Sequence, residues 1–211
     1  MITVVGSLKG GSGKSTVTFN LAVWLAMGEV DVQVIDLDPQ ATLRDVAEIR
    51  DEEGYRPAIH VKGKKALKDL EQLKTADEVL IDVGTADLKT MKKALVIADR
   101  ILVPVPPSQA DIWSTQRFIH FVASLEKEKS PEILGFINRG DTHHAITETD
   151  EAAAALVTLP GINFIKPRLA QRTIFRRSFS EGLAVFELKA SGKGSIEFSA
   201  LCAKLYPNVV R

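Results

Sequence analysis

Residues 9–16 read Lys-Gly-Gly-Ser-Gly-Lys-Ser-Thr and follow a short apolar run at residues 2–5. The ordinary phosphate-binding loop has a glycine, four residues, a second glycine, a lysine and then serine or threonine. Here Leu8 stands where the first glycine is expected, and a second lysine, Lys9, stands beside it. Glycines let backbone N–H groups approach phosphate oxygens because no Cβ blocks the way. The stretch therefore predicts a buried strand, a phosphate-binding loop and a helix that begins near Lys14.

The residue types of this loop suit the phosphates of a nucleotide with its magnesium ion. The lysine before the helix, Lys14, is expected to reach the β- and γ-phosphates, and the Ser15 hydroxyl to ligate Mg²⁺. The N-terminal end of the helix favours anions through its unpaired N–H groups and its dipole. We expect the nucleotide to be held by Gly10, Gly11, Ser12, Gly13, Lys14, Ser15 and Thr16.

The extra lysine, Lys9, has two alternative roles. If its side chain points into its own pocket, it duplicates Lys14. If it points outward, it can lie against the phosphates of a facing subunit. The residues of the loop leave both alternatives open.

The loop with its extra lysine resembles the deviant Walker A motif of the ParA/MinD family of ATPases. Further segments are similar to later motifs of that family, and the late run from Gln171 to Glu187 looks like the C-terminal region of short ParF-type plasmid-partition ATPases. The resemblance spans essentially the whole chain. The further segments are residues 34–40 (Val-Ile-Asp-Leu-Asp-Pro-Gln), 79–84 (Val-Leu-Ile-Asp-Val-Gly) and 103–111 (Val-Pro-Val-Pro-Pro-Ser-Gln-Ala-Asp).

The resemblance implies catalytic roles for Lys9, Lys14 and Asp38. Lys9 would contact the partner's nucleotide in an ATP-bound sandwich dimer, and Asp38 would orient the attacking water. Ser15, Asp36 and Asp82 would form the metal site. Phosphoryl transfer mainly requires positioning and charge neutralisation, and these residue types supply both. The alternative for Asp36 and Asp38 is a helix cap or a turn before Pro39.

The resemblance places the adenine contacts at two other segments. Asn138 and Arg139 follow the apolar stretch 133–137, and Pro107 and Asp111 belong to the proline-containing segment. Ordinary turn chemistry explains these four residues equally well.

Apolar runs alternate with helical patterns along the chain, which favours an α/β fold: a P-loop NTPase with a mostly parallel twisted sheet and helices on both faces. At 211 residues the chain suits one ParA-like domain, with no N-terminal helix-turn-helix before the first strand. A short edge strand is expected within residues 50–65. The predicted strands are 2–6, 32–36, 78–82, 100–105, 133–138 and 162–165, and the predicted helices are 14–27, 41–50, 64–73, 87–98, 111–128, 146–157, 170–180 and 194–206.

Composition favours a cytoplasmic protein. The formal net charge is +0, so no global field draws the chain to nucleic acid. One cysteine, Cys202, excludes an internal disulfide and an iron–sulfur cluster with its own cysteine ligands, and is expected to be a buried small hydrophobe. No signal peptide or membrane-length apolar run is present. The adjacent His143 and His144 are expected in a solvated loop rather than at a metal.

A basic segment is the one local charge asymmetry near the C-terminus. No acidic residue lies between 166 and 180, and Arg172 and Arg176 would share one face of the predicted helix. Such a cluster could neutralise DNA phosphates without reading sequence, or its arginines could pair with acids elsewhere. The lysines at 62–68 look like ordinary surface beside Asp69 and Glu71. The predicted DNA-binding residues are Lys166, Arg168, Arg172, Arg176 and Arg177.

Together these features predict an ATPase of weak intrinsic turnover that uses ATP and Mg²⁺ in plasmid or chromosome segregation. ATP would assemble the homodimer, and the dimer would bind DNA non-specifically and associate with the nucleoid. A ParB-like or other small adaptor protein would stimulate hydrolysis and release it. The alternatives are a ParA-like ATPase that positions a protein cargo and a MinD-like membrane-associated ATPase. Stable membrane association is not expected, because the last apolar helix carries few basic residues and meets Pro207.

Overall fold

A parallel sheet forms the centre of the protein, whose computed structural model describes residues 1–126, 128–143 and 147–209. In the described chain the sheet has the strand order β3-β2-β4-β1-β5-β6-β7, and β8 pairs with β6. Every pairing is parallel. The strands are β1 (Ile2–Val5), β2 (Val32–Asp36), β3 (Val61–Lys62), β4 (Glu78–Asp82), β5 (Arg100–Val105), β6 (Glu132–Gly140), β7 (Asn163–Phe164) and β8 (Leu169–Ala170).

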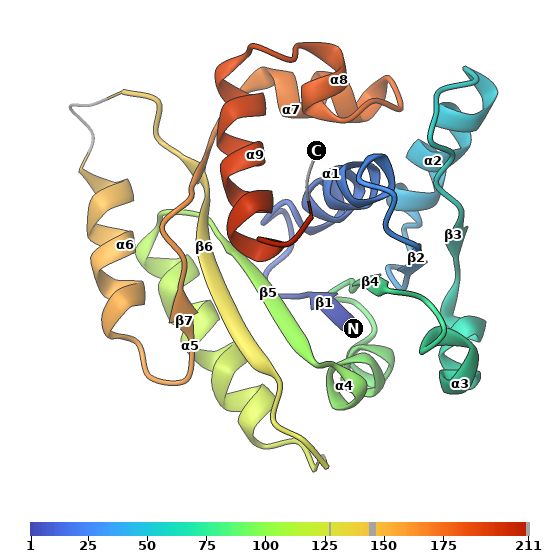
Figure 1. Cartoon of the computed structure of the whole chain (residues 1–211). Coiled ribbons are helices and arrows are strands. Elements are labelled where there is room, and N and C mark those ends of the chain that lie inside the picture. The colour runs from blue at the N-terminus through green and yellow to red at the C-terminus, as the bar shows by residue number, and fades with distance from the viewer. Residues whose placement is uncertain (127, 144–146, 210–211) are drawn as a thin grey trace.

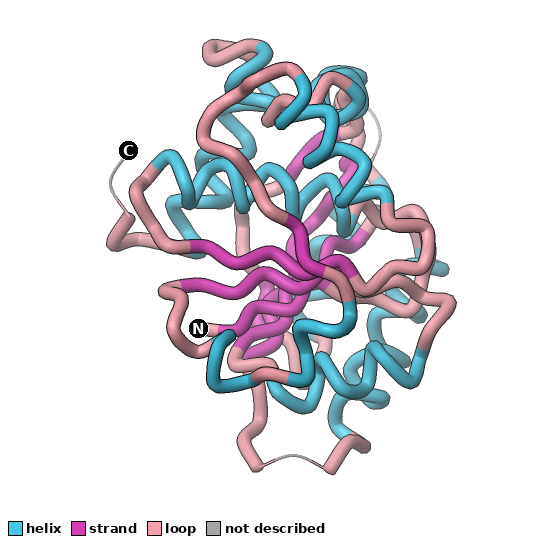
Figure 2. Tube along the Cα trace, turned by 90° about the vertical axis from the view of Figure 1, so that its right-hand side faces the viewer, coloured by secondary structure: helices cyan, strands magenta, loops and turns pink. Residues whose placement is uncertain are grey.

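Helices cover both faces of this sheet (Figures 1 and 2). On one face lie α1, α2, α7, α8 and α9, and on the other lie α3, α4, α5 and α6. This arrangement confirms the predicted fold class. The helices are α1 (Lys14–Met27), α2 (Thr42–Glu52), the 3₁₀ helix η1 (Lys64–Lys68), α3 (Leu70–Leu73), α4 (Leu88–Ile97), α5 (Gln109–Ala123), α6 (Glu148–Thr158), α7 (Thr173–Ser180), α8 (Val185–Leu188) and α9 (Lys193–Leu205).

The central strands carry apolar residues on both sides because both faces of the sheet are covered. Successive side chains of a strand point to opposite faces. Val5 and Leu80 belong to the core under α1 and α9, whereas Val4 and Ile81 belong to the core under α4 and α5. The absence of polar alternation in the sequence therefore has a direct physical cause.

Three predicted helices differ from the structure. The segment 64–73 is a 3₁₀ helix followed by one α-helical turn, because none of the η1 side chains is buried and Asp69 caps a new turn through the Gln72 N–H. The predicted helix 111–128 begins earlier, at Gln109, and ends at Ala123, where the Ser124 N–H closes the last turn. The predicted helix 170–180 begins only at Thr173, because Leu169–Ala170 pairs with β6 as β8.

Other expectations are confirmed or fall outside the described residues. β3 is the expected edge strand, and Cys202 is buried. The one-turn helix α8 has no counterpart among the predicted elements. His144 and the first residue of the predicted helix 146–157 lie outside the described residues. Among the helices described, none is long and apolar enough to cross a membrane.

Candidate nucleotide-binding site

The loop between β1 and α1 is shaped by two glycines with left-handed backbones. Gly11 has φ 76° and Gly13 has φ 90°, which residues with a Cβ rarely adopt. A Cβ on Gly13 would also lie only 2.4 Å from the Asn138 amide nitrogen. Helix α1 then begins without a side-chain cap and without an acidic residue in its first turn. Its first N–H groups are therefore left for an anion at the loop.

Lys14 folds back over this loop. Its ammonium group donates hydrogen bonds to Ser7 Oγ at 3.3 Å and to the Lys9 carbonyl oxygen at 3.1 Å. Burial lowers the pKa of Lys14, while the carboxylates of Asp82 and Asp38 act in the opposite direction. The charge thus lies inside the loop, where phosphate oxygens would neutralise it.

Asp82, at the end of β4, is a buried carboxyl group without a hydrogen-bond donor. Neither of its oxygens accepts a hydrogen bond from the described residues. Burial raises its pKa to about 7 and the Asp36 carboxylate adds to this, whereas the nearby Ser15 hydroxyl and Lys14 lower it. A buried unsatisfied carboxyl group calls for an ion or water at that point. Asp82 and Ser15 therefore fit a Mg²⁺ ion held partly through water.

Asp36 has its oxygens occupied by the backbone. They accept hydrogen bonds from the N–H groups of Asp38 at 2.9 Å and Arg44 at 3.3 Å. Burial raises the pKa of Asp36, and these two hydrogen bonds lower it. The carboxylate thus fastens the turn between β2 and α2, which is the alternative that the sequence left open. Its metal role stays a prediction.

Asp38 lies against the segment that follows Asp82. One carboxylate oxygen accepts the Gln40 N–H at 2.9 Å. A Cβ on Gly84 would lie 2.6 Å from Asp38 Cγ, so only glycine permits this close approach. The ends of β2 and β4 are thereby packed together beside the loop. The described residues contain no group of three His, Cys, Asp or Glu side chains able to hold a metal, so Mg²⁺ here would depend on phosphate oxygens.

Lys9 has different surroundings from Lys14. Its ammonium group forms an ion pair of 2.8 Å with Asp111, and its side chain remains 46% exposed. Asp111 lies in the first turn of α5, where it also accepts a hydrogen bond from the Ser108 hydroxyl. The structure therefore places Asp111, a predicted adenine contact, beside the extra lysine of the loop.

A cavity of about 320 Å³ opens beside the loop, next to Gly13 and Thr16. Asn138 and Arg139 line it, and the Asn138 amide donates a hydrogen bond of 2.7 Å to the Ser12 carbonyl oxygen. The cavity has the size of a small-molecule site. Pro107 is not among its lining residues but belongs to a separate cavity of about 220 Å³ beside α6.

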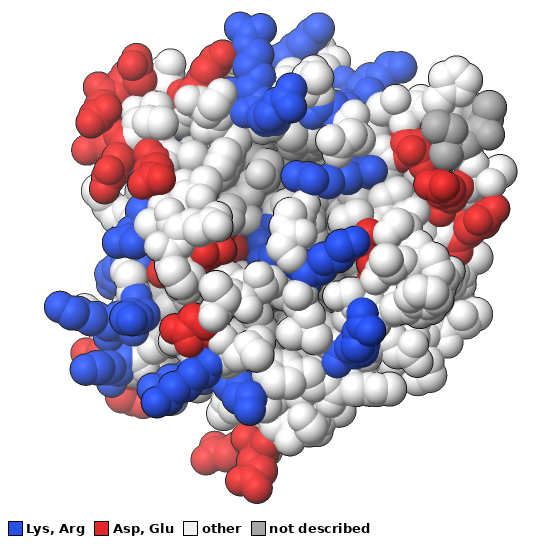
Figure 3. Space-filling model, turned by 180° about the vertical axis from the view of Figure 1, so that it is seen from behind, with Lys and Arg blue, Asp and Glu red and all other residues white. Residues whose placement is uncertain are grey.

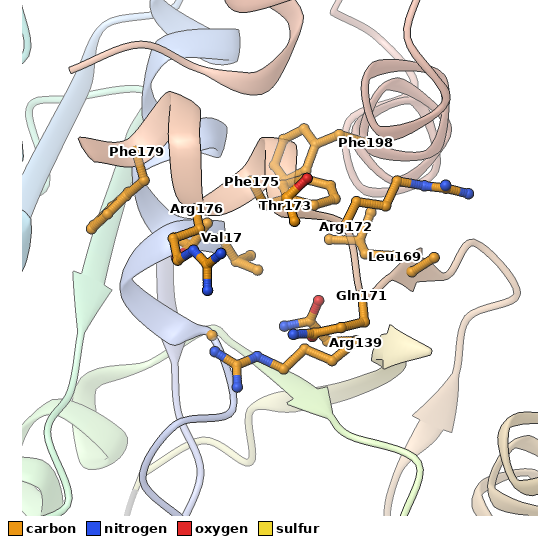
Figure 4. A pocket seen from close by; sticks show the side chains of 14 residues that line it. Val17, Arg139, Leu169, Gln171, Arg172, Thr173, Phe175, Arg176, Phe179 and Phe198 are labelled. Carbon is orange, nitrogen blue, oxygen red and sulfur yellow. The ribbon is translucent and has the colours of Figure 1, made fainter. Parts of the chain in front are cut away.

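The far wall of this cavity comes from the start of α7. Figure 4 shows Arg139 of β6 and Arg176 of α7 pointing toward the same space, whereas Arg172 points away from it. Gln171 and Phe175 also line the cavity. Sequence reasoning gave Arg176 a different role and missed Gln171 and Phe175 as site residues, because no motif spacing connects α7 to the loop.

Comparison with known families supplies the assignment. Residues 3–185 match the model of the CobQ/CobB/MinD/ParA nucleotide-binding domain. The chain belongs to this family. It is 25% identical over 199 residues to the maintenance of carboxysome distribution protein A of Halothiobacillus neapolitanus, across 92% of this chain and 90% of that protein. It is 26% identical over 193 residues to the protein ParA of Rhizobium radiobacter, across 90% and 86% of the two chains.

Solved structures of the ParA/MinD type share the fold. Apo McdA of Cyanothece superimposes with a TM-score of 0.78 at 20% identity, over 97% of this chain and 98% of that chain. The cell division protein MinD of Aquifex aeolicus gives a TM-score of 0.76 at 18% identity, over 100% and 98% of the two chains. Membership of this family thus agrees with the parallel sheet covered by helices on both faces.

In this ParA/MinD-family chain the basic segment is largely paired. Arg172 forms an ion pair of 2.6 Å with Glu197, Arg168 one of 2.7 Å with Asp150, and Arg177 one of 2.9 Å with Glu181. Within the described part of the chain, Lys166 and Arg176 make no ion pair. Arg172 precedes α7 instead of lying within it, so the predicted helical face shared with Arg176 is wrong. Figure 3 shows Lys and Arg side chains at the top of the molecule, the end at which Figure 1 has α7 and α8.

Proposed function

We propose that the protein is an ATP-dependent switch for DNA partition, in which two copies enclose ATP face to face. The observation that carries this proposal is the division of the two loop lysines. Lys14 is 7% exposed and lies inside the loop, whereas the Lys9 side chain is 46% exposed and pairs with Asp111 of α5. An outward lysine on a phosphate-binding loop suits the phosphates of a second subunit.

Each residue then has one task. The loop N–H groups and Lys14 bind the phosphates, and Asp38 orients the attacking water. Ser15 and Asp82 would hold Mg²⁺, which neutralises charge that develops on the phosphate oxygens. Asn138, Arg139 and Arg176 would hold the base and ribose in the adjoining cavity.

The dimer would bind DNA without sequence preference and associate with the nucleoid, and a ParB-like or other small adaptor would release it by stimulating hydrolysis. Dimerisation places two weak basic surfaces together and raises their combined affinity. The Rhizobium relative is a protein ParA, which agrees with the ParA-type resemblance on which the partition proposal rests. The name of the Halothiobacillus relative favours a second candidate, the positioning of a protein assembly.

A MinD-like attachment to membranes has less support. Most apolar side chains of α9 are turned toward the body of the protein: Phe198, Leu201 and Cys202 are fully buried, and of its large apolar side chains only Ile196 is exposed, at 63%. An interfacial helix would need this face for the bilayer.

The test is nucleotide-dependent DNA binding, followed by the anisotropy of a labelled random-sequence duplex. We expect binding with Mg²⁺ and a non-hydrolysable ATP analogue, no binding with ADP, and a steep fall in affinity with salt. Lys14→Ala should bind nucleotide poorly, so adding the ATP analogue should not produce DNA binding by this variant. Equal binding with and without the analogue, or association with anionic vesicles in place of DNA, would contradict the proposal.

A further inference from the structure

A groove with an apolar floor and a lysine rim lies between η1, α3 and α4. None of the residues that line it belongs to the phosphate-binding loop. Its volume is about 850 Å³. Figure 3 shows Lys and Arg side chains gathered at the lower left, the side that carries α3 in the opposite view of Figure 1. We call this surface the lysine groove; its rim is Lys64, Lys65, Lys68, Lys89, Lys92 and Lys93.

The floor of the lysine groove is aliphatic. Leu67, Leu70, Ile97 and Leu125 are partly buried and rest on the core below the sheet. Val96 on α4 is 38% exposed between them. The lysines of α4 are spaced so that they flank Val96 on the outer side of the helix. The result is an apolar strip bordered by positive charges.

The rim lysines form no ion pair with Asp87, the acidic residue that lines the groove; hydrogen bonds from Thr90 chiefly lower the pKa of Asp87, and the charge of Lys64 adds to this. None of the six rim lysines forms an ion pair within the described chain, and only Lys92 has a ring contact, at 5.6 Å from the Phe121 centroid. The acids nearby have other partners. Asp69 caps α3, Asp87 caps α4, and Glu71 pairs with Lys74 at 3.1 Å. In a chain of formal net charge +0, six lysines without an ion pair among the described residues gather around this one groove.

We infer that the lysine groove binds an acidic amphipathic segment of a partner protein, with apolar side chains on the floor and carboxylates against the rim. Charge complementarity selects an acidic occupant. An amphipathic helix satisfies both an apolar floor and a charged rim, because its apolar stripe is flanked by polar positions. DNA phosphates would use the rim but leave the aliphatic floor without a contact.

The lysine groove is separate from the nucleotide site, so its test does not depend on the proposed switch. The probe is a fluorescein-labelled synthetic peptide with a leucine stripe at helical spacing and glutamates on both flanks. The control peptide has the same leucines with lysines in place of the glutamates. Fluorescence anisotropy of each peptide is titrated with the full-length protein at two salt concentrations.

We expect saturable binding of the glutamate peptide, weakened by salt, and no binding of the lysine peptide. The triple charge reversal Lys89→Glu, Lys92→Glu and Lys93→Glu should weaken binding about tenfold or more, since each exposed pair contributes a modest share. Val96→Asp should also weaken binding of the glutamate peptide, because it places a charge on the apolar floor of the groove. The matched reversal Lys189→Glu, Lys193→Glu and Lys204→Glu, on exposed lysines elsewhere, should leave it unchanged.

Nucleotide binding checks that each variant is folded, and all should bind a fluorescent ATP analogue like the wild type. The proposal is overturned if the glutamate peptide does not bind, if both peptides bind equally, or if the two triple variants behave alike. Loss of DNA binding in the α4 variant, without any peptide binding by the wild type, would assign the groove to nucleic acid instead.

Discussion

At the scale of single residues, the two lysines of the phosphate-binding loop have different surroundings. Lys14 is enclosed, donates to Ser7 and to the Lys9 carbonyl oxygen, and has a lowered pKa because of burial. Lys9 is held at the surface by Asp111. The Lys9 side chain is 46% exposed although its Asp111 partner is buried, so a more highly charged anion such as a nucleotide phosphate can compete with Asp111 for the Lys9 ammonium group. One lysine is therefore enclosed within the loop, and the other is accessible at the surface.

The first prediction concerns Lys9→Ala. We expect this variant to lose ATP-dependent dimerisation and keep nucleotide binding by the monomer, because the loop N–H groups and Lys14 remain. Light scattering with a non-hydrolysable ATP analogue measures the dimer, and a fluorescent analogue measures nucleotide affinity. Lys204→Ala, an exposed lysine on α9, is the control. An undiminished Lys9→Ala dimer would refute the role of Lys9.

The second prediction concerns Asp38→Ala. We expect the dimer to form with ATP but phosphate release to stop, because the variant keeps the loop and loses the group that positions water. Asp38 holds the Gln40 N–H, so the turn is expected to loosen without unfolding. Phosphate release and light scattering on the same sample separate the two effects. Phosphate release at the wild-type rate would exclude Asp38 from catalysis.

At the scale of elements, Arg172 fixes where α7 begins. Its guanidinium group donates to both carboxylate oxygens of Glu197 on α9, and Glu197 also accepts the Ala170 N–H of β8. β8, the start of α7 and α9 are thereby joined at one carboxylate. Since α7 forms a wall of the candidate nucleotide cavity, this junction supports the site from outside it.

The third prediction compares two arginines of this region. Arg172→Ala should lower the free energy of unfolding by about 1–2 kcal/mol, because a half-buried bidentate pair is lost. Arg177→Ala removes an exposed helical pair and should cost about 0.5 kcal/mol or less. Urea unfolding followed by circular dichroism measures both. Equal costs would show that the Arg172 junction does not stabilise the region.

At the scale of the whole molecule, a buried polar cluster joins the end of α9 to the sheet. Glu78 of β4 accepts hydrogen bonds from Thr3 and from the Tyr206 hydroxyl at 3.0 Å, and it pairs with Arg100 at 3.3 Å. Arg100 also donates to the Leu205 carbonyl oxygen at 3.0 Å. Burial raises the pKa of Glu78, while Thr3 and Arg100 lower it. The packing of β1, β4 and β5 against the end of α9 therefore depends on the Glu78 carboxylate.

The fourth prediction follows from that dependence. Glu78→Ala should lower the free energy of unfolding by about 3–5 kcal/mol, because Arg100 is left buried without its partner. The control is Lys129→Ala, which removes the exposed pair with Asp99 and should cost about 1 kcal/mol or less. Thermal and urea unfolding measure the difference. A Glu78→Ala protein as stable as the control would show that the cluster has no net role in stability.

The sequence by itself determined the family, the parallel sheet with two covered faces and the position of the phosphate-binding loop. These follow from local patterns: glycines where no Cβ fits, a lysine and serine at the start of a helix, and strands without polar alternation. The helix boundaries predicted from the sequence were wrong where packing or capping decided them, as at η1, Ala123 and Thr173.

The tertiary structure decided every relation between distant residues. Only the folded chain brings Asp111 to Lys9, leaves Asp82 without a donor, and pairs Arg172 with Glu197. It also gathers the rim of the lysine groove from α4 and from η1, whose lysines the sequence presents as ordinary surface. The physical reason is that ion pairs and burial depend on distance in space, and linear spacing reports that distance only within a helix or a strand.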